Sequence, residues 1–145
     1  MKLSLLLLLS CLLLGCATRH PIEDAKVIAK SHEAFAKAGN LDSVMSNFAD
    51  DFVGLVPGMP LIKGKDSARR FYGGVLSTTK SEFVHEYDGA DIVGDAVSLH
   101  GTAKGTLTKP DSTVAPFVNN FMMVLKYQPD GRMKFWRAAF APRSP

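Results

Sequence analysis

The spacing of apolar residues changes once along the chain, and this change limits the possible folds more than any other feature. Over residues 22–36, 41–48 and 68–76, apolar residues recur at intervals of three and four, which is the period of an amphipathic helix. From Ser81 onward they alternate with polar residues in long runs broken by turn residues, as strands do. Helices followed by strands predict an α+β domain, with a curved antiparallel sheet wrapped over three N-terminal helices.

Turn-forming residues divide the two halves into elements. Pro21 suits the first turn of a helix, Gly39 can end that helix, and Asn40 can cap a second one whose apolar face reaches Phe48. A third helix is expected after Gly64. Extended runs are expected over residues 52–56, 82–92, 96–108, 114–127 and 133–141.

The first fifteen residues have the pattern of an export signal. Lys2 precedes a leucine-rich stretch that is too short to span a bilayer as a permanent helix. The stretch ends in Leu13-Leu14-Gly15-Cys16, which resembles the lipobox of bacterial lipoproteins, where the cysteine receives a diacylglyceryl group and becomes the first mature residue. The expected organisation is a signal peptide over residues 1–15, lipidated Cys16 with a short tether over 16–20, and a folded domain over 21–142.

The lipobox resemblance implies a cell-envelope protein held at a membrane through its lipid. Ala17 rather than Asp follows the cysteine, which implies the periplasmic face of the outer membrane if the cell is Gram-negative. Two or three acyl chains anchor a protein stably, whereas one holds it only marginally. An ordinary secretory signal cut near Ala17, with Cys16 incidental, is the alternative interpretation.

Composition argues against several classes of function. The 145 residues carry 17 Lys and Arg against 14 Asp and Glu, and this net charge of +3 is spread along the chain, so we expect no nucleic-acid partner. Cys11 leaves with the signal and Cys16 carries lipid, so no thiol remains for a disulfide or a nucleophile. There is no phosphate-binding glycine loop, and His85 with His100 gives only a weak metal signal. We therefore expect neither a cofactor nor a metal.

The run from Phe117 to Leu125 is apolar on both of its alternating faces. Both faces of the sheet must therefore be covered near this run. The helices can cover one face, but no segment remains for the other. This pattern predicts a homodimer that forms sheet against sheet.

Several short motifs follow one another in a characteristic order along the mature chain. They are Ala38-Gly39-Asn40, Phe48-Ala49-Asp50-Asp51-Phe52-Val53, Ile62-Lys63-Gly64, and a last strand entered through Asp130-Gly131-Arg132-Met133-Lys134-Phe135-Trp136. This order resembles the nuclear transport factor 2-like superfamily, and more narrowly its SnoaL-like branch, over about residues 21–142. The resemblance implies a cone-shaped cavity, around which this fold hosts isomerases, dehydratases, cyclases, epoxide hydrolases and binding modules.

The chain departs from the catalytic residues of two groups in that superfamily. Ketosteroid isomerases use a carboxylate base, a tyrosine and a protonated aspartate, and the corresponding positions here are Val56, His32 and Met123. Sequences that resemble limonene epoxide hydrolase end in Trp-Arg-x-Tyr-Phe-Asp, whereas this chain has Ala141 in place of the terminal carboxylate. These departures argue against both reactions.

The same alignment, combined with strand alternation, predicts a mostly apolar cavity with a few polar groups. Such a wall suits a small apolar or aromatic ligand. His32 and His100 are the candidate catalytic residues, because imidazole exchanges protons near neutral pH, although a histidine on an apolar helix face is more often a core residue. The other expected ligand-binding residues are Phe52, Val56, Tyr72, Ser98, Asn119, Phe121, Met123, Trp136 and Phe140.

Two functions remain open at this point. The missing carboxylates favour an envelope-anchored module that binds a small molecule without turnover. The two histidines favour a cofactor-free isomerase, dehydratase or cyclase, with His32 or His100 as base and Asn119 or Ser98 steadying the developing oxyanion. A cavity filled by large side chains would instead indicate an envelope interaction protein.

Overall fold

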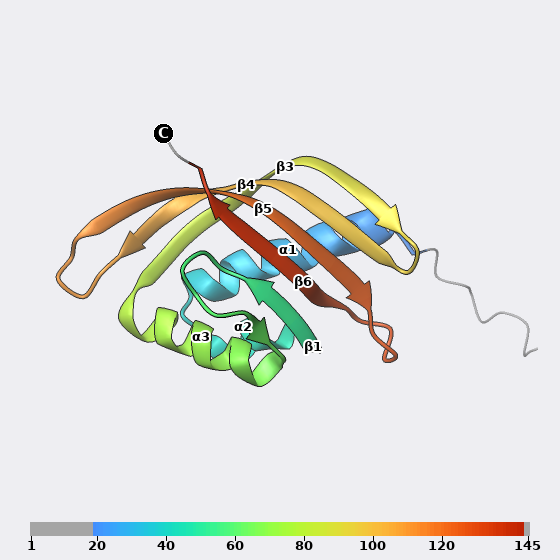
Figure 1. Ribbon diagram of the computed structural model, residues 1–145, viewed down its shortest axis with the longest axis horizontal. Helices are drawn as coiled ribbons and strands as arrows, with labels where there is room; N and C mark the ends of the chain where they lie inside the picture. The colour runs from blue at the N-terminus through green and yellow to red at the C-terminus, as the bar shows by residue number, and fades with distance from the viewer. Residues whose placement is uncertain (1–18, 144–145) are drawn as a thin grey trace, which may run out of the picture.

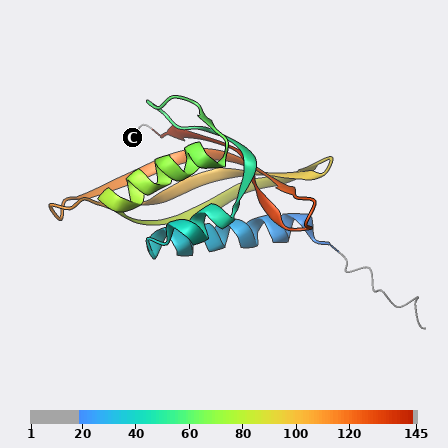
Figure 2. The same cartoon turned by 90° about the horizontal axis from the view of Figure 1, so that it is seen from below.

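A computed structural model describes residues 19–143, which form three helices and one six-stranded sheet. The helices are α1 (Pro21–Lys37), α2 (Leu41–Ser46) and α3 (Lys65–Thr78). The strands are β1 (Phe48–Leu55), β2 (Ile62–Lys63), β3 (Lys80–Val93), β4 (Ala96–Thr108), β5 (Val114–Tyr127) and β6 (Met133–Pro142). Figures 1 and 2 show the helices on the concave side of a curved sheet that does not close. The predicted α+β fold is confirmed.

The strands follow the order β2-β1-β6-β5-β4-β3, so β3 is an edge strand. Neighbours pair antiparallel except β1 and β6, which run parallel. The β3–β4 hairpin pairs from Lys80 and Thr108 at one end to Val93 and Ala96 at the other. One end of the sheet thus carries the β3–β4 and β5–β6 turns, and the opposite end carries the β4–β5 turn (Figure 1).

Local sequence explains where the first helices begin and end. Pro21 occupies the first turn of α1, where its missing N–H is not needed. Gly39 follows α1 with a φ of 66°, a left-handed conformation that glycine adopts without strain. The Asn40 side chain then caps α2 by accepting the Ser43 N–H at 3.0 Å.

The second helix is shorter than its apolar pattern predicts. Phe48, which was expected on the apolar face of α2, instead begins β1 and pairs with Phe135 of β6. The Asn47 carbonyl accepts the Phe135 N–H at 2.8 Å, which joins the end of the helix directly to the sheet. Pairing with a distant strand therefore outweighs the helical spacing of residues 44–48, and periodicity alone could not show this.

Two glycines of β4 allow β3 to curl closely over it. A Cβ atom at Gly101 would lie 2.0 Å from the Glu86 carbonyl oxygen, and one at Gly105 would lie 2.1 Å from the Glu82 carbonyl oxygen. No other residue type fits at such a distance. A register shift between Tyr87 and Gly89 further bends β3. The curl turns the inner face of β3 toward α1.

The core lies between α1 and the concave face of the sheet. Alanines at 25, 29 and 36 form a stripe of small buried residues on α1, so the helix approaches the strands closely. Large buried side chains face them, including Phe48, Leu99 and Leu125. This stripe follows the helical period that the sequence shows.

The outer face of the sheet is covered by no other element of residues 19–143 (Figure 1). Its apolar side chains include Val84, Val118 and Met122, of which Met122 is 54% exposed. The homodimer that would cover this face stays a prediction. No helix within residues 19–143 has both the length and the apolar character needed to cross a bilayer. The signal peptide and Cys16 lie outside the described residues.

Candidate functional site

A cavity of about 310 Å³ lies between α1, α3 and the concave face of the sheet. Aromatic and aliphatic side chains from both helices and four strands form most of its wall, and no charged side chain lines it. The polar lining groups are His32, Tyr72, Ser81, His85 and Asn119. The remaining lining residues are Val56, Pro57, Phe71, Val75, Phe83, Ala103, Leu107, Phe117 and Phe140.

Eight of the predicted site residues face the concave side, but only some of them reach the cavity. His32, Val56, Tyr72, Asn119 and Phe140 line it. Phe52, Phe121 and Met123 are instead packed into the hydrophobic core, with 4% or less of each residue exposed. These three side chains fill part of the space between the helices and the concave face of the sheet. The cavity therefore occupies only the part nearer α3 and the β4–β5 turn.

Ser98 and His100 lie on the outer face of the sheet, contrary to the prediction. Leu99 between them is fully buried in the core, and strand alternation sends its neighbours to the opposite side. The His100 side chain is 40% exposed, with Nδ1 4.0 Å from an Asp91 oxygen. Neither residue can act on a molecule in the cavity. The sequence showed the alternation of β4 but not which of its faces meets the helices.

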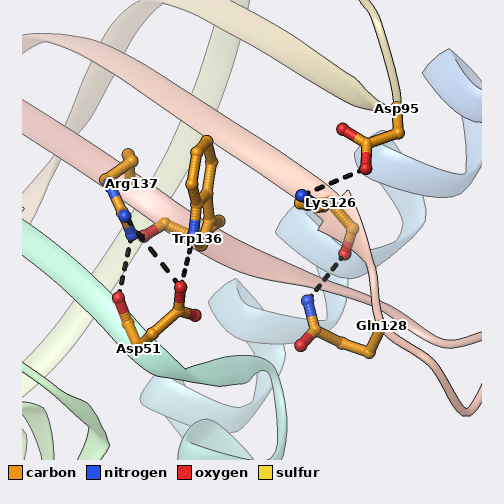
Figure 3. A network of polar contacts seen from close by, with 6 residues as sticks. All are labelled: Asp51, Asp95, Lys126, Gln128, Trp136 and Arg137. Carbon is orange, nitrogen blue, oxygen red and sulfur yellow. Dashed lines mark hydrogen bonds and ion pairs between the residues drawn. The ribbon is translucent and has the colours of Figure 1, made fainter.

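Trp136 also lies on the outer face, at a register shift of β6 that turns it away from the cavity. Its indole N–H donates to an Asp51 side-chain oxygen at 2.8 Å, and the Arg137 guanidinium stacks 3.9 Å from the ring centroid (Figure 3). Arg137 in turn donates to the Asp51 carbonyl oxygen at 2.8 Å. This network joins β1 to β6, so Trp136 has a structural role and does not contact the cavity.

The strongest chemical feature of the cavity is a buried pair formed by His85 of β3 and Glu33 of α1. One Glu33 oxygen accepts the His85 backbone N–H at 2.9 Å and lies 2.8 Å from the ring Nδ1. Because that oxygen already serves as an acceptor, the ring meets it as a donor, with its proton on Nδ1. The other ring nitrogen, Nε2, is then the unprotonated one and is left for a bound molecule.

The two partners are shielded from solvent to different degrees. The His85 side chain is 3% exposed and that of Glu33 is 11% exposed. Burial lowers the pKa of His85, while the hydrogen bond and the charge of Glu33 oppose this by favouring the protonated ring. The net shift lowers the pKa of His85, so near pH 7 the ring is neutral and able to accept a proton.

His32 presents a second imidazole to the same cavity. Its ring lies edge-on to Phe48, Tyr72 and Phe135, with centroids 5.3–5.5 Å apart. Burial, helped by the nearby His85, lowers the pKa of His32 to about 3. Its Nδ1 is buried without a hydrogen-bond partner among the described residues. His32 is therefore a neutral group at physiological pH, and Nε2 is the nitrogen that can serve a ligand.

The tyrosines near the pair are neutral hydroxyl groups as well. Burial raises the pKa of Tyr72 above its ordinary value, and burial together with the Glu33 charge raises the pKa of Tyr87 to about 12. Within residues 19–143, no group of three or more histidine, cysteine or carboxylate side chains is arranged to hold a metal ion. Chemically, the described cavity offers neutral donors and acceptors in an apolar wall.

A family model for the SnoaL-like domain matches residues 28–137 of the chain. The chain belongs to this family. The match begins within α1 and spans α3 and most of the sheet, so it includes Glu33 and His85. No curated protein matches the sequence closely enough to be called a relative.

Solved structures of other proteins share the fold of this SnoaL-like domain. A ketosteroid isomerase-like protein from Erwinia carotovora atroseptica SCRI1043 has a TM-score of 0.77 at 20% identity, over 88% of this chain and 100% of that one. A protein provisionally named a scytalone dehydratase, from Novosphingobium aromaticivorans DSM 12444, has a TM-score of 0.77 at 10% identity, over 84% and 83%. A conserved protein from Planctomyces limnophilus DSM 3776 has a TM-score of 0.76 at 17% identity, over 86% and 100%. These similarities show the fold alone.

Sequence reasoning missed both members of the Glu33–His85 pair as site residues. A signal for His85 was present, because Phe83, His85 and Tyr87 alternate with the acidic residues of β3 and so share the apolar face. Glu33 gave no such signal. It lies beside His32 on the rim of the α1 apolar face, and its partner is 52 residues away in the sequence.

The lowered pKa of His32 predicts a pH dependence of the free energy of unfolding. An unfolded chain takes up a proton here near pH 6.5, whereas the folded chain resists it until about pH 3. The contribution of His32 to the free energy of unfolding is therefore fully present above pH 6.5. It is lost as pH falls toward 3, by as much as about 5 kcal/mol in total. Urea unfolding between pH 7 and pH 4 should show this loss reduced in His32→Leu. His100→Ala serves as the exposed control and should behave like the parent; an equal loss in His32→Leu would contradict the account.

Proposed function

We propose that the cavity of this SnoaL-like domain binds a small, largely apolar or aromatic molecule. The observation that carries the proposal is a 310 Å³ cavity with an apolar wall and a few neutral polar groups, a composition typical of small-molecule sites. The aromatic side chains Phe71, Phe83 and Phe117 offer faces and edges to a ring system. Neutral polar groups make a highly charged ligand unfavourable, because no charged side chain lines the wall to compensate its desolvation.

A cavity-filling variant tests this binding. Ala103 is 4% exposed and lines the cavity from the middle of β4, so Ala103→Leu should occupy ligand space. We expect native mass spectrometry of the parent domain, purified from its own cells, to detect a bound small molecule. We also expect members of a panel of steroids, aromatics and polyketide-like acids to raise its melting temperature. Both effects should disappear in Ala103→Leu.

The control substitution is Val118→Leu, which adds the same kind of volume on the outer face of the sheet. It should keep the bound mass and the thermal shifts. If Ala103→Leu fails to fold, Asn119→Ala removes a polar lining group without adding volume. No bound mass and no shift across the whole panel for the parent domain would contradict the binding proposal.

The Glu33–His85 pair favours a second candidate, a cofactor-free enzyme that moves a proton on the bound molecule. In this proposal His85 Nε2 removes a proton from a carbon next to a ligand carbonyl, and the C–H electron pair passes into the enolate. Glu33 stabilises the imidazolium that results, at 2.8 Å from Nδ1. His32 stays neutral and donates from Nε2 to the enolate oxygen. The imidazolium then returns the proton at the same or another atom.

Proton exchange gives a readout that needs no knowledge of the natural substrate. In D₂O, we expect the domain to catalyse deuterium incorporation next to the carbonyl of some cyclic or aromatic ketones that raise its melting temperature. His85→Gln should abolish this exchange and Glu33→Gln should slow it by about 10²-fold or more, because the imidazolium loses its charged partner. His100→Gln should leave the rate unchanged, since His100 lies on the outer face. Exchange that survives His85→Gln would exclude His85 as the base.

We propose further that the domain is carried as a bacterial lipoprotein in the cell envelope. The support is Leu13-Leu14-Gly15-Cys16 after a leucine-rich stretch. Membrane fractionation tests it, because Cys16→Ser should move the protein from the membrane fraction to the soluble fraction. Ser10→Ala keeps the cysteine and is the control, expected to remain with the membrane. Membrane retention of Cys16→Ser would contradict the lipid anchor.

A further inference from the structure

One end of the domain combines the start of the described chain with two exposed apolar residues. Ile92 and Val93 lie at the tip of the β3–β4 hairpin, directly before the Gly94–Asp95 turn, and are 58% and 62% exposed. They add to the apolar surface at a hairpin tip, where small and polar residues are common. In Figure 1 this tip lies at the same end of the domain as the point where the described chain begins, and in Figure 2 the β5–β6 turn lies between the two.

Side-chain contacts hold the start of the chain at that end. The Arg19 guanidinium stacks 4.4 Å from the centroid of the Tyr127 ring, near the end of β5. Arg19 also lies over the β5–β6 turn, 3.9 Å from where a Cβ atom at Gly131 would be. The Tyr127 hydroxyl donates in turn to Asp24 in the first turns of α1. The Arg19 side chain thus packs against the end of β5.

Strand register places the hairpin tip close to the end of β5, where Arg19 packs. Val93 pairs with Ala96, and Ala96 pairs with Lys126, the neighbour of Tyr127. Two strand spacings, or about 10 Å, therefore separate the tip from the end of β5. An ion pair of 3.0 Å between Lys126 and Asp95 ties the turn of the hairpin to β5 (Figure 3).

Covalent geometry limits how far Cys16 can lie from the same end. Only three residue steps separate Cys16 from Arg19. Even a fully extended chain covers at most about 11 Å over three residues. A lipid on Cys16 would therefore hold this end of the domain near the bilayer surface, with the hairpin tip within reach of it.

We propose that the tip of the β3–β4 hairpin inserts end-on into the lipid bilayer beside the Cys16 anchor, with Ile92 and Val93 on its two opposite faces, and fixes the orientation of the domain. This inference rests on the proposed lipid anchor. Two aliphatic side chains are too few to bind a membrane alone, but an anchor raises their effective concentration at the surface. The charged groups at this end include both signs, Arg19, Lys126 and Arg132 against Asp91, Asp95 and Asp130. The contact therefore depends on apolar burial and not on anionic lipid.

The orientation has a consequence for the cavity. Leu107 and Phe117 line the cavity close to the β4–β5 turn, at the opposite end of the sheet. Leu107 is eleven residues along β4 from Ala96, which corresponds to about 36 Å of strand. The cavity end of the domain would therefore point away from the bilayer, and its ligand would enter from the aqueous compartment.

Site-specific fluorescence on the full, lipid-bearing chain tests this orientation. Val93→Cys and Val114→Cys introduce a thiol at opposite ends of the sheet, at valines that are 62% and 57% exposed. Each is labelled with an environment-sensitive nitrobenzoxadiazole probe and reconstituted into phosphatidylcholine vesicles that contain nitroxide-labelled phospholipid. We expect a blue-shifted emission and loss of most of the fluorescence at position 93, and neither effect at position 114.

The controls separate this inference from the lipid anchor. The parent chain without an added cysteine should take up no probe and should float with the vesicles, because the lipid blocks the Cys16 thiol. Labelling of Cys16 together with loss of flotation would overturn the anchor, and the orientation with it. Flotation with equal quenching at positions 93 and 114, or with none at 93, would overturn the orientation alone. Replacing phosphatidylcholine with anionic phospholipid should change neither signal.

Discussion

The whole arrangement depends on a close backbone contact between two neighbouring strands. β3 crosses so near to β4 at Gly101 and Gly105 that a side chain at either position would collide with a carbonyl oxygen of β3. The contact lets the edge strand curl over α1 instead of continuing flat. Without that curl, the inner face of β3 would not meet the helix, and His85 would not reach Glu33. The curvature of the sheet is thus encoded mainly by small residues on one strand.

The same curl determines which part of the space between the helices and the sheet is filled by side chains. Toward the β5–β6 turn, large side chains such as Leu99, Leu125 and Phe135 pack against the alanine stripe of α1 and leave no room. Toward α3 and the β4–β5 turn, β4 contributes only Ala103 and Leu107 to the wall, and the space remains open. An open half beside a filled half explains how one sheet can supply both stability and a site.

The chemistry of the site follows from the absence of charged side chains from the wall of the described cavity. Glu33 lies behind His85 and not in the wall, so its charge acts through the imidazole and the apolar lining is preserved. Burial keeps both histidines neutral near pH 7, and Glu33 restores part of the basicity of His85 but not of His32. Two chemically identical side chains thereby receive different properties from their surroundings.

Much of the fold was predictable from the sequence, because the spacing of apolar residues indicates which segments are helices and which are strands. Pro21 and Gly39 mark the two ends of α1, and the alternation of residues 81–141 marks the four long strands, whereas the end of α2 was predicted too late. The placement of Ser98, His100 and Trp136 was not predictable, because alternation gives two faces without saying which one meets the helices. The register shift at Trp136 added a further change of face. Glu33 could not be found at all, since its role depends on a contact that exists only after the sheet has curled.

The protonation of His85 is the most direct test of this account. Nitrogen-15 NMR of the histidine-labelled domain at pH 7 reports which ring nitrogen carries the proton. We predict a neutral His85 ring with its proton on Nδ1 and a free Nε2, and a different proton distribution between the two nitrogens in Glu33→Gln. A proton on Nε2, or a charged ring at pH 7, would contradict the claim that Glu33 holds His85 as a base facing the cavity.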